Sequence, residues 1–499
     1  MPTRSSTEAL EYEKKSTLAW LSFIGSIIAV LMSIMDIQIT NAAIGTIQTA
    51  MKFPLEKGSW ISSSYLMAEI VTLPLSGLLL KALGTKRYAF IFCALFMLSS
   101  LLCAQAWNFS SLIIFRAFQG AAGGALMAFA YNLIIIKLPV HEHTKANTLF
   151  GATVALAPTL GPVLGGVMTE AFGWQSLFYI NLPIGLLALC LMMVGLRDDI
   201  YQRCVKLRID FIGLITVVVG LGCLQYVLEE GRSKGWFSST PIFMLSMTAL
   251  SALSLFVVNE LRVREPLVNL FLLKNRQLLV SCSANLLAGA ALFGCYFLIP
   301  YFLITIHSYS PIQISHVIIF GGVAQLVALR YMPGILTNIN IYVLIATGSF
   351  LFALSAVTWS FASTNFHYEW MIVAQILRGL GGTLMLTPLG ILATTSIQKD
   401  DAASASILFN VSRTLGGALG VAVLTTLVST QQTHYYANLM QPYQGEQDTL
   451  TAPFALLLHQ SYQFAFRDTF QIIAVLLLAT GCTFVLLRLH GCVNFQKKR

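Results

Sequence analysis

The chain has 499 residues, of which 56% are hydrophobic and only 10% are charged. This composition excludes a soluble globular protein and a disordered chain, and it is typical of a protein that crosses a lipid bilayer many times. The formal net charge of +9 does not indicate nucleic-acid binding, because the basic residues are divided among short loops. The nine cysteines lie mostly inside apolar runs without CxxC spacing, so we interpret them as small core residues.

Apolar runs of helical length divide the chain. Residues 1–16 are polar and charged, and the first apolar run is too long for the apolar core of a cleavable signal peptide. About twenty apolar residues span a bilayer as a helix. We therefore expect an all-α polytopic membrane protein with 14 transmembrane helices, at 18–43, 59–80, 88–106, 111–136, 146–168, 176–196, 211–228, 242–261, 278–304, 311–333, 341–361, 370–392, 403–429 and 466–489. The longest external segment, about 430–465, is polar.

Basic residues predict the orientation, because cytoplasmic loops carry an excess of Lys and Arg. If the N-terminus is cytoplasmic, the loops on that side hold most of the basic residues before residue 280. The opposite loops then hold little beyond Lys52, Lys57, Arg232 and Lys234. We therefore expect a multi-pass protein of the inner (plasma) membrane, with both termini in the cytoplasm.

Several predicted spans contain charged or strongly polar side chains. Ionisable groups inside a membrane span are costly, and they mark functional sites unless a partner explains them. Acids at helix ends, such as Glu229 and Glu230, are expected to be solvated by the interface instead. The candidates inside spans are Asp36 in the first, Glu69 in the second, Arg116 in the fourth, Arg378 in the twelfth, and Asn410 and Arg413 in the thirteenth.

Two of these acids are candidate proton carriers. A carboxyl group in a low-dielectric cavity takes up a proton more readily, and a nearby cation favours its release. We predict that Asp36 and Glu69 carry protons and that Arg116 is the electrostatic partner of an acid on the first or second helix. Each of these residues also has a structural alternative. Asp36 could form only a hydrogen bond to a neighbouring helix, and Arg116 could be a fixed cation. Glu69 could lie at a helix end or form an ion pair without a role in transport. We interpret Arg378 and Arg413 as structural cations.

The fifth span carries a stripe of small residues. Residues 157–166 read APTLGPVLGG, in which Gly161, Pro162, Gly165 and Gly166 combine close helix packing with a proline that disrupts the helix. We interpret this stripe as a packing device. It is also a candidate hinge or seal between two halves that rock against each other.

The fourth and fifth spans are echoed later in the chain, by QILRGLGGTLM and RTLGGALGVA. Internal repeats are typical of secondary transporters. A simple duplication of six helices would place the repeat six spans later, whereas here it comes eight spans later. We therefore predict that the seventh and eighth spans are inserted between two six-helix halves. The expected domains are a six-helix bundle at 1–196, an inserted pair at 197–277 and a second six-helix bundle at 278–499. The aligned pairs are Arg116 with Gln375, Gln119 with Arg378, Gly120 with Gly379, Gly123 with Gly382, and Gly161, Pro162 and Gly165 with Gly416, Gly417 and Gly420.

Six segments carry a resemblance to a known family: MDIQITNAAI (35–44), GLLLKALGTKR (77–87), FRAFQG (115–120), APTLGPVLGG (157–166), WQSLFYINLPIG (174–185) and EPLVNLFLLKNR (265–276). Together they resemble the major facilitator superfamily, and within it the fourteen-helix drug:proton antiporters of the EmrB/QacA type. The resemblance implies the major facilitator fold, with two six-helix bundles plus two inserted helices. It also marks Gly77, Gly84, Lys86 and Arg87 as the motif of the loop between helices 2 and 3, read as a conformational latch or only a topology determinant.

The chain departs from this family pattern at several positions. Lys81 stands where an acid is usual across the superfamily, as it also does in the EmrB-like subset. Gln38 in the first span and Gly45 just after it stand where Thr and Pro are commoner, and the tenth span has Gly321-Gly322 and no proline between its end residues Pro311 and Pro333. The run after the ninth span (IPYFLITIHSYSP, 299–311) also lacks the Gln that often follows its proline. We interpret the second half as the more divergent one, and an altered substrate preference is expected there.

The resemblance implies proton-coupled efflux of amphipathic drugs or other organic compounds by alternating access. The expected partners are the lipid bilayer, a small amphipathic substrate and protons, with no cofactor, metal or nucleic acid. In a Gram-negative cell an EmrA-like periplasmic adaptor and an outer-membrane channel are also implied. We expect no enzyme, because no nucleophile, metal or paired-carboxylate pattern appears, and no Walker A motif is present. The alternatives are an exporter of one endogenous siderophore, fatty acid or amino acid, and a membrane sensor without transport.

Overall fold

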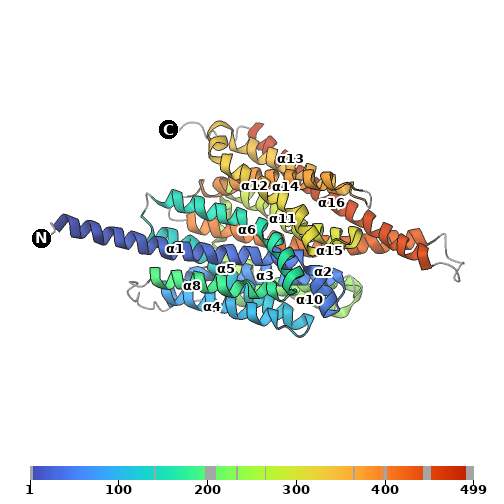
Figure 1. Cartoon of the computed structure of the whole chain (residues 1–499), viewed down its shortest axis with the longest axis horizontal. Coiled ribbons are helices and arrows are strands. Elements are labelled where there is room, and N and C mark those ends of the chain that lie inside the picture. The colour runs from blue at the N-terminus through green and yellow to red at the C-terminus, as the bar shows by residue number, and fades with distance from the viewer. Residues whose placement is uncertain are drawn as a thin grey trace.

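The computed structural model of the chain describes residues 4–139, 142–196, 210–231, 234–263, 266–363, 366–395, 397, 402–441 and 451–489. Over these residues all regular structure is helical, which confirms the all-α prediction. Figure 1 shows the helices of the first half (blue to green) on one side and those of the last third (yellow to red) on the other. Their long axes run broadly in one direction.

Helices occupy all the predicted spans. The first group comprises α1 (Arg4–Ala42), α2 (Ile44–Met51), η1 (Leu55–Gly58), α3 (Ser59–Leu83), α4 (Thr85–Ala104), α5 (Phe109–Lys137), α6 (His143–Phe172), α7 (Ser176–Tyr179) and α8 (Asn181–Gly195). The next elements are α9 (Phe211–Glu230), η3 (Trp236–Ser238), α10 (Thr240–Glu260) and η4 (Leu270–Lys274). The last group comprises α11 (Arg276–His307), α12 (Pro311–Asn338), α13 (Ile341–Ser360), α14 (Tyr368–Thr395), α15 (Ala402–Met440) and α16 (Thr451–Leu489).

Twelve segments among the described residues are long and apolar enough to cross a membrane, which identifies a multi-pass membrane protein. They include every predicted span except those of α3 and α6, which form helices of 25 and 30 residues at the expected places. The number of 14 crossings therefore stays a prediction.

Polar caps mark where several of these apolar helices begin. The Asn108 side chain accepts a hydrogen bond from the Ser111 backbone, and the Ser111 side chain accepts one from Asn108 in return. Ser310 and Gln313 form the same kind of capping box at the start of α12. Asn275 caps α11. These caps satisfy N–H groups that the first helical turn leaves free, so polar residues between apolar runs set the helix boundaries.

The predicted loop between the second and third spans is almost absent. Gly84 is the only residue between α3 and α4, and its φ of 75° lies in the left-handed region that favours glycine. Lys86 and Arg87 are exposed in the first turn of α4 rather than in a loop, and a side chain at Gly77 would meet no neighbour within 4 Å. The motif therefore forms a tight helix-to-helix corner.

The polar segment at 430–465 is also more regular than expected. Helix α15 continues to Met440, and α16 begins at Thr451, so most of this segment is helical. The Gln432 side chain donates a hydrogen bond to the Ser461 hydroxyl (3.2 Å), and Tyr435 donates one to Asp468 (2.6 Å). The two helices thus extend as a packed pair past the other helices, on the right in Figure 1.

The helices pack as two groups with a pair beside them. Helices α1 to α8 contact mainly one another, and so do α11 to α16. The groups meet chiefly along α6 with α12 and along α3 with α15. Helix α9 packs on α3 and α15, whereas α10 packs on α9. The division at 1–196, 197–277 and 278–499 stays a prediction.

Candidate functional site

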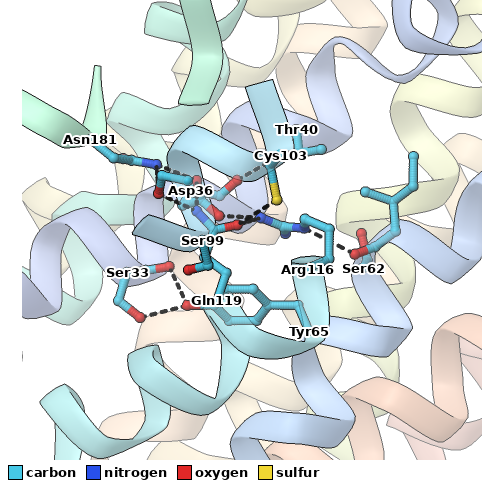
Figure 2. A network of polar contacts seen from close by, with 12 residues as sticks. Ser33, Asp36, Thr40, Ser62, Tyr65, Ser99, Cys103, Arg116, Gln119 and Asn181 are labelled. Carbon is cyan, nitrogen blue, oxygen red and sulfur yellow. Dashed lines mark hydrogen bonds and ion pairs between the residues drawn. The ribbon is translucent and has the colours of Figure 1, made fainter. Parts of the chain in front are cut away.

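A buried ion pair lies inside the first helix group (Figure 2). Arg116 of α5 donates through Nη1 to the Asp36 carboxylate of α1 and, at 2.7 Å, to the Gln119 side-chain oxygen. The Gln119 and Asn181 amides donate to the other Asp36 oxygen at 3.0 and 2.6 Å. All four side chains are fully buried. The acid on the first helix, not the one on the second, is therefore the partner of Arg116.

Backbone and aromatic groups hold the arginine in place. Arg116 Nε donates to the Ile61 carbonyl of α3 (3.2 Å), and the guanidinium lies 4.7 Å from the centre of the Tyr65 ring. The Tyr65 hydroxyl is 2.6 Å from the Ser33 hydroxyl on α1. In the described part of the chain, Arg116 Nη2 is buried without a hydrogen-bond partner. The site thus holds one full ion pair together with unused hydrogen-bonding capacity.

Two members of this site carried no assigned role in the sequence. Asn181 begins α8, and Ser100 of α4 accepts hydrogen bonds from both Gln119 (2.7 Å) and Asn181 (3.2 Å). The only signal for Asn181 was a lone amide at the start of an apolar helix, inside the motif at 174–185. A serine in an apolar helix carries almost no such signal, because serines often bond to their own helix.

A separate cavity of about 340 Å³ lies between the two helix groups. Its lining joins aromatic and aliphatic side chains to a few polar ones, as in small-molecule sites. Gln38 contributes from α1, two residues after Asp36, which does not itself line the cavity. Other lining residues are Tyr131, Phe150, Phe293, Tyr296, Gln325 and Phe409.

Glu69 lies in this cavity, away from Asp36. The Thr414 hydroxyl of α15 is 3.5 Å from the Glu69 carboxylate of α3, so the contact joins the two helix groups. Arg413 and Asn410 also line the cavity, and Arg413 donates to the Asn410 side chain (3.2 Å). Arg413 Nε is buried without a partner among the described residues. The predicted proton-coupling residues thus form two sites, and Arg413 belongs to the cavity wall.

Arg378 lies behind the cavity wall rather than in it. It is buried, and its Nε donates to the Gln375 side chain at 2.7 Å. Its guanidinium lies 4.8 Å from the centre of the Tyr296 ring, and Tyr296 does line the cavity. Arg378 therefore supports an aromatic wall residue.

The glycine stripe of α6 contacts both helix groups. Side-chain atoms at Gly161 and Gly165 would come within 3.0 Å of the Met35 and Ile39 carbonyl oxygens of α1. Gly166 lies against α12 of the second group, and the Ser315 hydroxyl of α12 donates to the Pro162 carbonyl. Glycine is needed where helix backbones approach this closely. The stripe thus lies in the seam between the groups.

Close packing supports the internal repeat. Gly120 of α5 lies against the Tyr65 carbonyl of α3, and Gly379 of α14 lies in the same way against the Gly321 carbonyl of α12. The aligned glycines of the fifth and thirteenth spans show the same relation, since Gly161 and Gly165 pack on α1 whereas Gly416 and Gly420 pack on α11. Arg116 with Gln119 and Gln375 with Arg378 are also matching hydrogen-bonded pairs in reversed order.

Comparison with known proteins covers most of the chain. The family model of the Major Facilitator Superfamily matches residues 26–421. The multidrug export protein EmrB of Haemophilus influenzae is 30% identical over 89% of this chain and 86% of its own length. The fatty acid resistance protein FarB of Neisseria gonorrhoeae is 32% identical over 83% and 81%. The colistin resistance protein EmrB of Acinetobacter baumannii is 28% identical over 83% and 81%.

Proposed function

Because the chain belongs to the Major Facilitator Superfamily, we propose that it is a proton-coupled antiporter that exports amphipathic organic compounds by alternating access. The multidrug export protein EmrB and the fatty acid resistance protein FarB support this proposal as relatives. We place the protein in the inner (plasma) membrane with both termini in the cytoplasm. The protein is a transporter and not an enzyme.

The observation that carries the proposal is the buried ion pair between Asp36 and Arg116. Removing two charges from water costs several kcal/mol per ion, and their attraction does not reliably return it. Such a pair inside a membrane span favours a functional role for the acid. Four hydrogen bonds orient the Asp36 carboxylate and its partners. Proton uptake by Asp36 removes the negative charge that fixes Arg116.

A route of direct contacts links this proton site to the seam between the halves. Asp36 shares α1 with Gln38, which lines the cavity. The same stretch of α1 packs against Gly161 and Gly165 of α6, and α6 contacts α12 through Gly166. When Asp36 changes charge, α1 shifts relative to α5, and the seam between α6 and α12 responds. Inward movement of one positive charge supplies about 2.3 kcal/mol per 100 mV of membrane potential.

The cavity wall suits an amphipathic substrate. Aromatic rings such as Phe150, Phe293 and Tyr296 present apolar surface, whereas Glu69 and Arg413 offer one charge of each sign. An amphipathic compound, cationic or weakly acidic, places its apolar body against the rings and its polar group near one of these charges. In a Gram-negative cell we propose an EmrA-like adaptor and an outer-membrane channel as partners.

The test is substrate-induced proton movement in proteoliposomes with an imposed pH gradient and a panel of lipophilic cations and weak acids. If the protein is an antiporter, at least one compound should cause protons to flow down the imposed pH gradient. The same compound should be transported against its own concentration gradient. The control is the same compound in protein-free liposomes, which reports leak. Proton flux that no member of the panel changes would contradict the proposal.

Glu69→Gln is expected to reduce uphill export by about tenfold or more. The substitution removes the charge of Glu69 from the cavity, and the loss of an interaction worth about 1.4 kcal/mol changes an equilibrium constant tenfold. The neutral amide no longer exchanges a proton beside Thr414 and Arg413. The measurement is initial export rate at several pH values. Glu170→Gln removes an exposed acid at the end of α6 and serves as the control. Equal pH profiles for both variants would show that Glu69 takes no part in coupling.

The runner-up function is export of one endogenous metabolite. The relative FarB, a fatty acid resistance protein, favours a fatty acid as that metabolite. The buried, unpartnered Nε of Arg413 in the cavity wall suits a carboxylate. A deletion strain distinguishes the two readings: loss of resistance to several unrelated compounds supports multidrug export, and accumulation of a single acid supports the runner-up.

A further inference from the structure

The last turn of α9, one of the two inserted helices, touches both helix groups. Glu229 of α9 accepts hydrogen bonds from the hydroxyls of Ser59 (2.6 Å) and Ser63 (3.1 Å) on α3. The next contact is with the other group: the Thr426 hydroxyl of α15 donates to the Leu228 carbonyl at 2.9 Å. Two adjacent residues of α9 therefore bind opposite halves of the transporter.

The Glu229 carboxylate is held by neutral donors. Besides the two serines, the Gln225 amide of α9 donates to it at 3.1 Å. Ser59, Ser63 and Gln225 are buried, and Glu229 itself is half-buried rather than solvated as expected for a helix end. Within the described ranges, no Lys or Arg lies within ion-pair distance of this carboxylate. Among the described residues, its charge is therefore stabilised by these three hydrogen bonds, and protonation of Glu229 weakens all of them.

In the part of the chain that the structure describes, the other groups around Glu229 are paired elsewhere or uncharged. Glu230, the next residue, forms an ion pair with Lys57 of η1 at 3.5 Å. The rings of Trp60 on α3 and Tyr226 on α9 lie with centres 6.2 Å apart. The facing turn of α15 presents the Thr426 hydroxyl. Glu230 is thus the nearest like charge, and Lys57 already compensates it.

We propose that Glu229 is a third proton-binding carboxyl, separate from both Asp36 and the cavity that holds Glu69, and that its protonation weakens the attachment of α9 to α3. As a carboxylate it attracts the Ser59 and Ser63 hydroxyls and fastens α9 across the boundary between the halves. When it takes up one proton it becomes a neutral acid, which gains one O–H to donate but loses the charge that strengthens those bonds. Helix α9 then acts as a proton-sensitive strap, by which we mean the connection from α3 through Glu229 and Leu228 to Thr426 of α15.

The strap and the Asp36 site act on the same turn of α3. Ile61, whose carbonyl binds Arg116, lies between Ser59 and Ser63 in this turn. Loosening this turn at Glu229 therefore changes the support of Arg116. The inference does not depend on the identity of the substrate, because it concerns only α9, α3 and α15.

Hydrogen–deuterium exchange of the full-length protein in lipid nanodiscs tests the proposal between pH 5 and 8, after correction for intrinsic exchange. In wild type, peptides covering residues 59–65 and 221–231 should exchange about tenfold faster at the acidic end, the change that loss of one charge-assisted hydrogen bond produces. Glu229→Gln should exchange at the fast rate at every pH. Ser59→Ala with Ser63→Ala should also be fast and independent of pH, which guards against a folding defect specific to one variant.

Neighbouring substitutions provide the controls. Glu230→Gln removes the adjacent acid and should keep the pH profile of wild type. Thr426→Val removes only the contact with α15, so the pH dependence at residues 59–65 should persist. A pH-independent wild type, or a Glu229→Gln protein with the wild-type profile, would overturn the proposal. These outcomes are independent of whether any compound drives proton flux in liposomes.

Discussion

Asp36→Asn is expected to reduce substrate-driven proton flux in proteoliposomes by at least about 100-fold, to the level of the leak. An amide cannot carry the proton, and it leaves Arg116 as a buried cation without a counter-charge. Breaking a buried pair in this way costs about 3–5 kcal/mol. The variant should therefore also unfold at lower denaturant concentration than wild type. Substrate binding, which involves the separate cavity, should persist.

A second variant distinguishes coupling from folding. Asp36→Asn combined with Arg116→Gln removes both charges, so it should recover stability without recovering proton-coupled export. Recovery of both properties would assign the pair a structural role only. Coupled flux that survives in Asp36→Asn alone would transfer the coupling role to Glu69.

Gly120→Ala and Gly379→Ala should each destabilise the protein by about 3 kcal/mol, the upper range for overpacking a core. A methyl group at Gly120 meets the Tyr65 carbonyl, and one at Gly379 meets the Gly321 carbonyl, closer than real side chains allow. Both obstacles are backbone atoms of a neighbouring helix, so no rotamer change relieves them. Equilibrium unfolding in mild detergent measures the loss.

Gly382 provides the matched control. It lies on α14 one turn after Gly379, and a side chain there meets nothing within 4 Å because the position faces the cavity. Gly382→Ala should keep or slightly raise stability, since alanine favours the helix by about 1 kcal/mol over glycine. Equal losses at Gly379 and Gly382 would mean that the effect is not close helix packing.

The sequence predicted the helices well and their ends less well. Hydropathy reports where a chain can lie in lipid, so it located the apolar part of each helix. It does not report where a helix continues into water, which explains why α15 and α16 extend into the polar segment at 430–465. The family resemblance predicted a loop between the second and third spans, whereas Gly84 is the one residue between α3 and α4.

The site was predicted only in part. A buried Arg needs a counter-charge, so the pairing of Arg116 with an acid on the first or second helix followed from the sequence. Which acid it is depended on helix rotation, which composition does not give. The repeat is also asymmetric at Asp36. The repeat-related glycines Gly161 and Gly416 pack on Met35 and Leu286, so these two residues correspond to each other. The residues that follow them are Asp36 and Leu287, so the second half has a leucine in place of the acid.

The extended pair of α15 and α16 has a mechanical consequence. Each helix has 39 residues, or ~58 Å at 1.5 Å per residue, against a hydrocarbon thickness of about 30 Å. A rigid body that long acts as a lever. Beyond the predicted spans, which end at 429 and begin at 466, α15 continues by ~16 Å to Met440 and α16 by ~22 Å to Thr451. If the second half turns by about 15°, as haemoglobin subunits do, these extensions move at their tips by roughly 4–6 Å. A rotation of the second half is thus carried outside the membrane by these two helices.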